Sequence, residues 1–230
     1  LKRFPFLPRT AAAGEPELRR LTSLFLDCKE FSGARGLVVT DDIAVAISAQ
    51  ACLPILRLGL QAYDGFVGIV VHPGQALVRR ESTDEDGVVH EYDEVLAGEA
   101  MDGGPVMLSW RDVRAAGASA AIGYNVVVHE FAHVLDMAQG LADGVPVLPA
   151  SIPRVEWERT LSAEYEAFCT RVNAEEATVL DPYGAESRSE FFAVASEAFF
   201  VSPDAMKGEH PDLFLLLARY YRQDPSARDA

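Results

Sequence analysis

The amino-acid sequence predicts an α+β fold, dominated by helices, with a small mixed sheet next to one buried helix. Three observations predict it. Apolar residues recur at helical spacing through most of the chain. Short runs of β-branched residues replace this pattern between residues 66 and 110, where Asp86-Gly87 is a strong hairpin-turn signal. The segment 126–136 is apolar nearly all round, which is typical of a buried helix.

Composition limits the class of protein. With 49% hydrophobic residues and moderate charge, the chain is expected to be globular. Its 230 residues are within reach of one large domain or two small ones, and we expect one, residues 1–230. Within it, a helical N-terminal part (1–64) precedes the sheet and the remaining helices (65–230). The acidic charge argues against direct nucleic-acid binding, which needs a basic surface. No apolar run reaches about 18 residues, so we expect no membrane span.

The cysteines and the N-terminus predict a cytoplasmic location. Cys28, Cys52 and Cys169 are an odd, widely spaced set in apolar surroundings, which is typical of buried free thiols in a reducing compartment. Prolines interrupt the apolar residues near the N-terminus, so this stretch is a poor signal peptide.

The first elements follow from apolar spacing and from the residues that start or stop helices. A helix is expected over residues 15–30, with a proline in its first turn, and a second begins at residues 41–42 and ends near Pro54. Strands are expected at residues 37–39, 66–71, 76–80, 88–92 and 105–110. The acid-rich stretch 81–99 lacks the spacing of an EF-hand calcium loop. Further helices are expected over residues 153–173, 190–200 and 213–221.

The segment 126–136 contains the pattern H-E-x-x-H. Residues four apart lie on the same face of a helix, so His129 and His133 can present both imidazoles to one metal ion, with Glu130 at the edge of the site. This arrangement is typical of zinc hydrolases, in which such a glutamate takes a proton from water. The pattern also occurs by chance on amphipathic helices. Burial favours the metal site here, because unpaired buried polar groups cost several kcal/mol.

A catalytic zinc takes three protein ligands. Asp136 and Gln139 occupy the positions that would complete a three-histidine motif, so the third ligand must come from elsewhere. Glu190 and Glu197 lie seven residues apart in an otherwise apolar helix, and two carboxylates in such a helix need a cation or hydrogen bonds. We favour Glu190 as the ligand over Glu197.

Several other polar residues have weaker signals. Glu197 is a candidate to hydrogen-bond a ligand imidazole, and Asp136 competes for that role. Tyr183, seven residues before Glu190, is a candidate donor to an oxyanion. The remaining histidines lack ligand spacing and are expected to be ordinary residues; they are His72, His90 and His210.

The motifs H-E-F-A-H-V-L-D, D-P-Y-G-A-E-S and E-F-F-A-V-A-S-E-A-F-F together resemble the bacterial Mlc titration factor A family of zinc metallopeptidases. Further matches upstream, such as L-A-G-E-A and G-P-V-M-L-S-W, extend the resemblance from about residue 18 to residue 225. The resemblance implies a zincin-like fold, similar in its catalytic part to the protease domain of anthrax lethal factor.

The resemblance also implies roles for single residues. His129, His133 and Glu190 would hold one zinc ion, Glu130 would be the general base, and Tyr183 would be the oxyanion donor. Thermolysin-like relatives of this type carry an acid four residues after the ligand glutamate, where this chain has valine, so the choice between Glu197 and Asp136 stays open. Aminopeptidase-type activity and binding of a transcriptional repressor of sugar-uptake genes are further properties that the resemblance implies.

We therefore expect a cytoplasmic zinc peptidase that hydrolyses peptides with metal-activated water, and in which the strand at residues 106–109 pairs with an extended substrate. One alternative is an interaction protein that sequesters a regulator and has a vestigial or structural zinc site. A second alternative is a buried helix that binds no metal.

Overall fold

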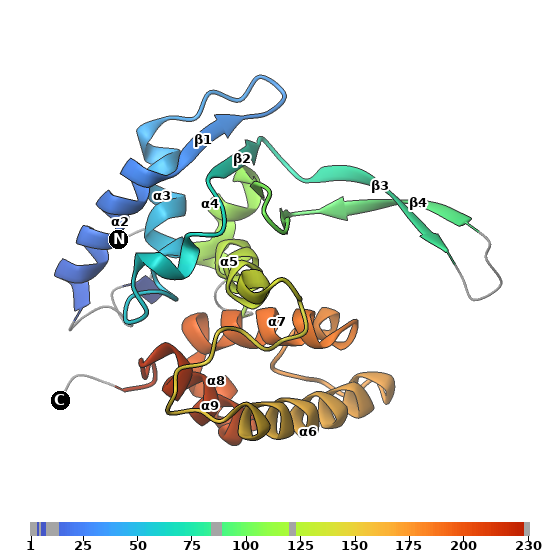
Figure 1. The fold of residues 1–230 in the computed structure, drawn as a ribbon. Coiled ribbons are helices and arrows are strands. Elements are labelled where there is room, and N and C mark those ends of the chain that lie inside the picture. The colour runs from blue at the N-terminus through green and yellow to red at the C-terminus, as the bar shows by residue number, and fades with distance from the viewer. Residues whose placement is uncertain (1–3, 5, 8–13, 84–88, 120–122, 228–230) are drawn as a thin grey trace.

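The computed structural model describes residues 4, 6–7, 14–83, 89–119 and 123–227. It confirms the α+β class, with many helices and a small mixed sheet. Helix α5 (Val126–Asp136) lies between an upper part that contains the sheet and a lower part built from the last helices, as Figure 1 shows. Every side chain of the H-E-x-x-H pattern therefore lies on a helix in the middle of the molecule.

The N-terminal part contains two helices and one strand. Helix α2 (Glu15–Cys28) leads into strand β1 (Glu30–Gly33), and helix α3 (Asp41–Ala51) follows. The strand expected at residues 37–39 is wrong: this stretch forms an extended loop in which Val38 is 76% exposed. The strand instead lies where the backbone finds a partner, since β1 pairs in parallel with the next strand.

The four-stranded sheet has the order β1-β2-β6-β5. Strands β2 (Gly68–His72) and β6 (Val106–Ser109) confirm two of the expected strands, and both pairings from β1 to β6 are parallel. The three-residue strand β5 (Gly98–Ala100) was not expected and pairs antiparallel with β6. Because β6 has β2 on one side and β5 on the other, the prediction that residues 106–109 pair with a substrate is wrong. Among the described residues, β1 and β5 are the two edge strands, and β5 is the one next to β6.

A separate two-stranded sheet projects away from the body of the molecule (Figure 1). It consists of β3 (Ala76–Thr83) and β4 (Val89–Leu96) in antiparallel register, and this confirms the expected hairpin strands. The expected turn at Asp86-Gly87 lies outside the described residues. The hairpin begins next to β2 and ends next to β5, so its base lies beside the sheet edge.

The remaining helices confirm the expected ones and add short segments. Two α-helices were not expected, α4 (Trp110–Ser119) and α8 (Pro203–Glu209). The others are α6 (Arg154–Asn173), α7 (Arg188–Val201) and α9 (Pro211–Tyr221), with 3-10 turns at Leu60–Tyr63, Met137–Gln139 and Pro182–Ala185. No helix among the described residues is both long enough and apolar enough to cross a bilayer.

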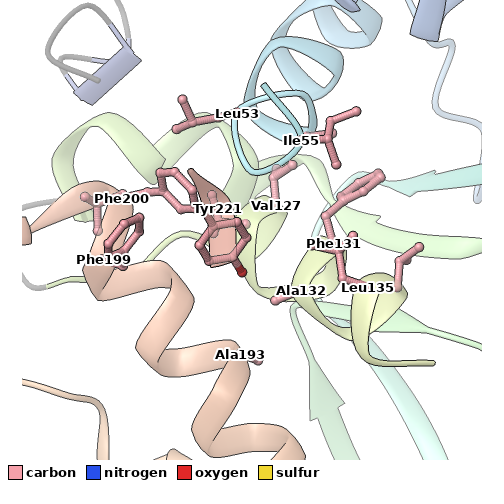
Figure 2. Close-up of a cluster of buried hydrophobic side chains, with 14 of the residues drawn as sticks. Leu53, Ile55, Val127, Phe131, Ala132, Leu135, Ala193, Phe199, Phe200 and Tyr221 are labelled. Atoms are coloured by element: carbon pink, nitrogen blue, oxygen red, sulfur yellow. The ribbon is translucent and has the colours of Figure 1, made fainter. Parts of the chain in front are cut away.

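A continuous apolar core fixes the orientation of α5. Figure 2 shows Val127, Phe131 and Leu135 on the side of the helix that faces the segment around Ile55. The ring of Phe131 lies 5.0 Å from that of Tyr63, and burial of each such side chain contributes about 1.5–3 kcal/mol. Because the face of α5 with Val127, Phe131 and Leu135 packs in the core, the histidines on the other face of the helix point toward α7.

The cysteines differ in exposure. Within the described chain all three are free thiols: Cys52 is buried, Cys169 is half-buried and Cys28 is exposed. The expectation of buried thiols is therefore wrong for Cys28, which is the last residue of α2.

Candidate metal centre

The N-terminus of α5 is fixed by Asn125. The side-chain oxygen of Asn125, which is fully buried, accepts hydrogen bonds from the backbone N–H groups of Val127 and Val128 at 3.0 and 3.1 Å. Its side-chain amide donates to Gln50 of α3 at 3.0 Å. Such a cap satisfies N–H groups that have no partner within the helix. It sets the helical phase that brings His129 and His133 to one face.

Helix α7 supplies the carboxylates. Ser187 caps this helix by accepting from the backbone N–H of Glu190 at 3.1 Å, which fixes Glu190 in the first turn. Glu190 is half-buried, whereas Glu197 is only 2% exposed. Burial of the Glu197 carboxylate needs compensating hydrogen bonds, because a charge without partners is very unfavourable in the interior.

Three potential ligand atoms converge between α5 and α7. The Nε2 atoms of His129 and His133 lie 3.2 Å apart, and Glu190 Oε2 lies 3.1 and 3.3 Å from them. Atoms that each bind one tetrahedral zinc at ~2.0–2.1 Å are separated by roughly 3.3 Å. The spacing and the donor types therefore fit a metal ion, and His129, His133 and Glu190 form a candidate metal-binding group.

The second nitrogen of His129 faces Glu197. His129 Nδ1 lies 2.7 Å from Glu197 Oε1, so this nitrogen is placed to donate to the carboxylate, and Nε2 is the atom available to a metal. The other oxygen of Glu197 accepts a hydrogen bond from the backbone N–H of Asn125. Glu197 thus links the ligand imidazole to the capped start of α5.

The second nitrogen of His133 is linked to a different acid, Asp136, by the hydroxyl group of Ser189. His133 Nδ1 lies 3.1 Å from Ser189 Oγ, and Ser189 donates to Asp136 at 2.8 Å. The same Asp136 oxygen accepts from the backbone N–H of Gly144 at 2.9 Å. Glu197 and Asp136 therefore do not compete for one position, since Glu197 contacts His129 directly and Asp136 reaches His133 through Ser189.

Glu130 lies beside the three converging atoms without belonging to that group. Its side chain is 5% exposed, and burial raises the pKa of the carboxyl to about 7, against the opposing effect of His129. Gly98 of β5 packs against it: a Cβ atom at Gly98 would lie 2.6 Å from Glu130 Cγ. Only a residue without a side chain leaves the Glu130 carboxylate its present position.

Two cavities flank the metal-binding group along β5. One, of about 350 Å³, is lined by His133, Glu190 and Ala100; the other, of about 260 Å³, is lined by Tyr124 and Val126. Both are lined by His129, Glu130 and Tyr183. Tyr183 is 39% exposed, and its ring centre lies 6.2 Å from that of His129. The phenol therefore borders the open side of the group.

The other histidines lie elsewhere. His210 is buried, and its Nδ1 lies 2.8 Å from Glu164 of α6, which makes it part of a packing contact between helices. His72 ends strand β2 and lies outside the metal-binding group. The side chain of His90 is outside the described residues.

Sequence reasoning missed three residues of the site. Asn125 has a recognisable signal, because an asparagine directly before an apolar helical run is a typical cap. Ser189 and Gly98 have no comparable signal. Their roles depend on contacts with His133 and Glu130, which are distant in sequence.

A mixed sheet whose edge strand lies beside an H-E-x-x-H helix, together with a glutamate from a later helix, defines a zincin-like metallopeptidase fold. Comparison with known families agrees. Residues 1–222 match the family described as glucose-regulated metallo-peptidase M90, and the chain belongs to this family.

Relatives cover nearly the whole chain. A protein named Mlc titration factor A from Pectobacterium atrosepticum is 36% identical, in an alignment that covers 96% of this chain and 85% of the relative. The protein of the same name from Yersinia pestis (strain Pestoides F) is 33% identical over 96% of this chain and 83% of its own length. A Synechocystis protein with the name "Uncharacterized protein slr2042" is 35% identical over 97% of this chain and 82% of its own length. The resemblance to the Mlc titration factor A family is confirmed.

Proposed function

We propose that this protein is a zinc-dependent peptidase of the bacterial cytoplasm, folded as one domain, with one zinc ion per chain held by His129, His133 and Glu190. The convergence of three ligand atoms within hydrogen-bonding distance of one another is the observation that carries the proposal. Two neutral imidazoles and one carboxylate suit zinc and leave a fourth position open. The bound ion would act as a Lewis acid that makes water a nucleophile near neutral pH.

Glu130 is the proposed proton carrier. It takes a proton from the attacking water and returns it to the leaving amine. A carboxyl with a pKa of about 7, raised by burial, suits both steps, because a general base works best near the ambient pH. Gly98 supports this role by leaving room for the Glu130 side chain against β5.

Tyr183 and β5 are proposed to bind the peptide. The Tyr183 phenol borders both cavities beside the metal-binding group and would donate a hydrogen bond to the oxyanion that forms at the scissile carbonyl. The outer edge of β5 offers backbone groups to which an extended peptide can add as a further strand. The aminopeptidase mode that the resemblance implies stays a prediction.

Replacement of Glu130 by glutamine tests the proposal. Glu130→Gln keeps the shape but cannot accept the proton, so peptide cleavage by zinc-loaded protein falls by about 10²–10⁴-fold while one zinc per chain is retained. Cleavage of a mixed peptide library, followed by mass spectrometry, supplies the readout. Chelated wild type, inactive until zinc is restored, is the control. Cleavage by Glu130→Gln at the wild-type rate would overturn the mechanism.

A second candidate function is binding of a transcriptional repressor. Relatives at 33% and 36% identity carry the name Mlc titration factor A, and this name speaks of titrating Mlc. We propose that this chain binds a repressor of that type, with or without peptidase activity. A pull-down with metal-free protein and with Glu130→Gln separates the two functions. Undiminished binding in both, together with no peptide cleavage by the zinc-loaded wild type, favours the sequestering protein.

A further inference from the structure

The proposed oxyanion donor, Tyr183, lies on a short 3-10 turn, Pro182–Ala185, rather than on an α-helix or a strand. Asp181 caps this turn by accepting a hydrogen bond from the backbone N–H of Tyr183 at 2.9 Å. Functional side chains are placed less precisely by loops and turns than by long helices and strands. The position of the Tyr183 phenol therefore depends on the contacts that fix the turn.

One side of the turn packs against α6 and α7. Gly184 is buried in this contact. A Cβ atom added there would lie 3.4 Å from atoms of Phe168, Phe191 and Val194. This packing sets how close the turn lies to the two helices. Apolar contacts are non-directional, so the orientation of the turn needs hydrogen bonds as well.

Tyr165 of α6 supplies a directional contact. Its hydroxyl donates to the backbone carbonyl of Ala185, the last residue of the turn, at 2.9 Å. The thiol of Cys169, one helical turn further along α6, lies 3.9 Å from the same oxygen and is a weaker donor. The centre of the Tyr165 ring lies 5.5 Å from that of Phe191 on α7. Tyr165 thus connects the turn to both helices.

Tyr165 differs from its neighbours on the inner face of α6. Trp157, Leu161 and Phe168 are fully buried, whereas Tyr165 is half-buried. A phenylalanine would make the same ring contact, so packing alone does not require the hydroxyl. Tyr165 lines neither of the two cavities beside the metal-binding group. Its hydroxyl can therefore influence a bound peptide only through the turn.

We propose that Tyr165 is a positioning residue for the peptidase reaction: its hydroxyl holds the turn so that the Tyr183 phenol stays beside the metal-binding group. This inference rests on the proposed peptidase function and on the role proposed there for Tyr183. Loss of the hydroxyl lowers the fraction of molecules in which Tyr183 is correctly placed. Because an oxyanion donor acts mainly in the transition state, the loss lowers kcat and leaves KM unchanged.

The kinetic test uses zinc-loaded protein and the peptide that wild type cleaves fastest in the mixed library. Tyr165→Phe removes only the hydroxyl, and kcat falls by about three- to tenfold, the change that corresponds to one ordinary hydrogen bond. Tyr183→Phe lowers kcat by about 10²-fold or more. The double variant is no slower than Tyr183→Phe alone, because Tyr165 acts through Tyr183.

Tyr63→Phe is the matched control. The Tyr63 hydroxyl also donates to a backbone carbonyl, that of Ala51, at 3.0 Å, but the side chain is fully buried in the core. Its loss lowers the melting temperature at least as much as Tyr165→Phe does and leaves kcat unchanged. A loss of stability alone is thereby separated from a loss of positioning.

Hydrogen exchange of metal-free protein tests the same contact without catalysis. The backbone N–H groups of Gly184 and Glu186 form hydrogen bonds within the turn, at 3.0 and 3.1 Å. These amides exchange several-fold faster in Tyr165→Phe than in wild type or Tyr63→Phe, because the turn opens more often. Equal exchange rates in the three proteins overturn the proposal.

The outcomes separate this inference from the proposed function. Wild-type kcat in Tyr165→Phe beside a slow Tyr183→Phe, or fully additive losses in the double variant, overturns the role of Tyr165 and leaves the peptidase. An unchanged kcat in Tyr183→Phe removes the oxyanion role of Tyr183 and this inference with it. No cleavage by zinc-loaded wild type overturns both the peptidase function and the inference.

Discussion

The Nδ1 atom of His129 lies 2.7 Å from Oε1 of Glu197, and the Glu197 side chain is only 2% exposed. The second Glu197 oxygen accepts from the backbone of Asn125, the residue that caps α5. One buried carboxylate therefore holds both the ligand imidazole and the start of the helix that carries it. Carboxylates in this position orient metal ligands, and their loss typically weakens metal binding 10–100-fold.

Glu197→Gln tests this relationship. Glutamine keeps the size of the side chain but removes the charge that orients His129, so the zinc dissociation constant rises by about 10–100-fold. The measurement is competition with a chelator of known affinity. The melting temperature of metal-free protein is the companion readout, because a purely structural role would lower it and leave zinc affinity unchanged. That pattern would contradict the assignment.

Ser189 and Asp136 act on the other imidazole as one unit. Ser189→Ala and Asp136→Asn each disturb the hydroxyl that accepts from His133, so each weakens zinc binding by about tenfold. Because the two residues lie in a single chain of hydrogen bonds, the double variant should be no weaker than the worse single one. The zinc affinities of wild type, the two single variants and the double variant together form a double-mutant cycle that measures this coupling. Fully additive losses would mean that Asp136 does not act through Ser189.

Gly98→Ala tests the packing of β5 against the proposed base. The added methyl group overlaps the side chain of Glu130, which must move away from the metal-binding group. Peptide cleavage should fall by at least about tenfold, since small displacements of a catalytic group have large effects. Gly74→Ala is the control, because a Cβ atom there meets nothing within 4 Å. Equal cleavage by both variants, with zinc retained, would show that Glu130 tolerates displacement.

Much of the site was predictable because its signals are local. The helical spacing of His129 and His133, and the placement of Glu190 in an apolar helix, depend on residues close in sequence, and the structure brings all three together. The choice between Glu197 and Asp136 was not predictable. It depends on two contacts between residues far apart in the chain: Glu197 with His129, 68 residues away, and Ser189 with Asp136, 53 residues away.

The sheet was predicted less well than the helices. The apolar run at residues 37–39, with two valines, favours a strand by propensity, but it pairs with no strand among the described residues, and strand β1 forms earlier beside β2. Strand β5 is three residues long and includes a glycine, so no periodicity identifies it. Its position at the sheet edge depends on pairing with β6, and this pairing also removes residues 106–109 as a substrate-binding edge.

The central claim is that His129, His133 and Glu190 together hold one metal ion. The most direct measurement is the metal content of purified protein by mass spectrometry after zinc loading and dialysis, for wild type, Glu190→Ala and the exposed control Glu166→Ala. We predict about one zinc per chain in wild type and in Glu166→Ala, and a content several-fold lower in Glu190→Ala, in line with the three-ligand requirement. Equal zinc in wild type and Glu190→Ala, or no zinc in wild type, would contradict the account.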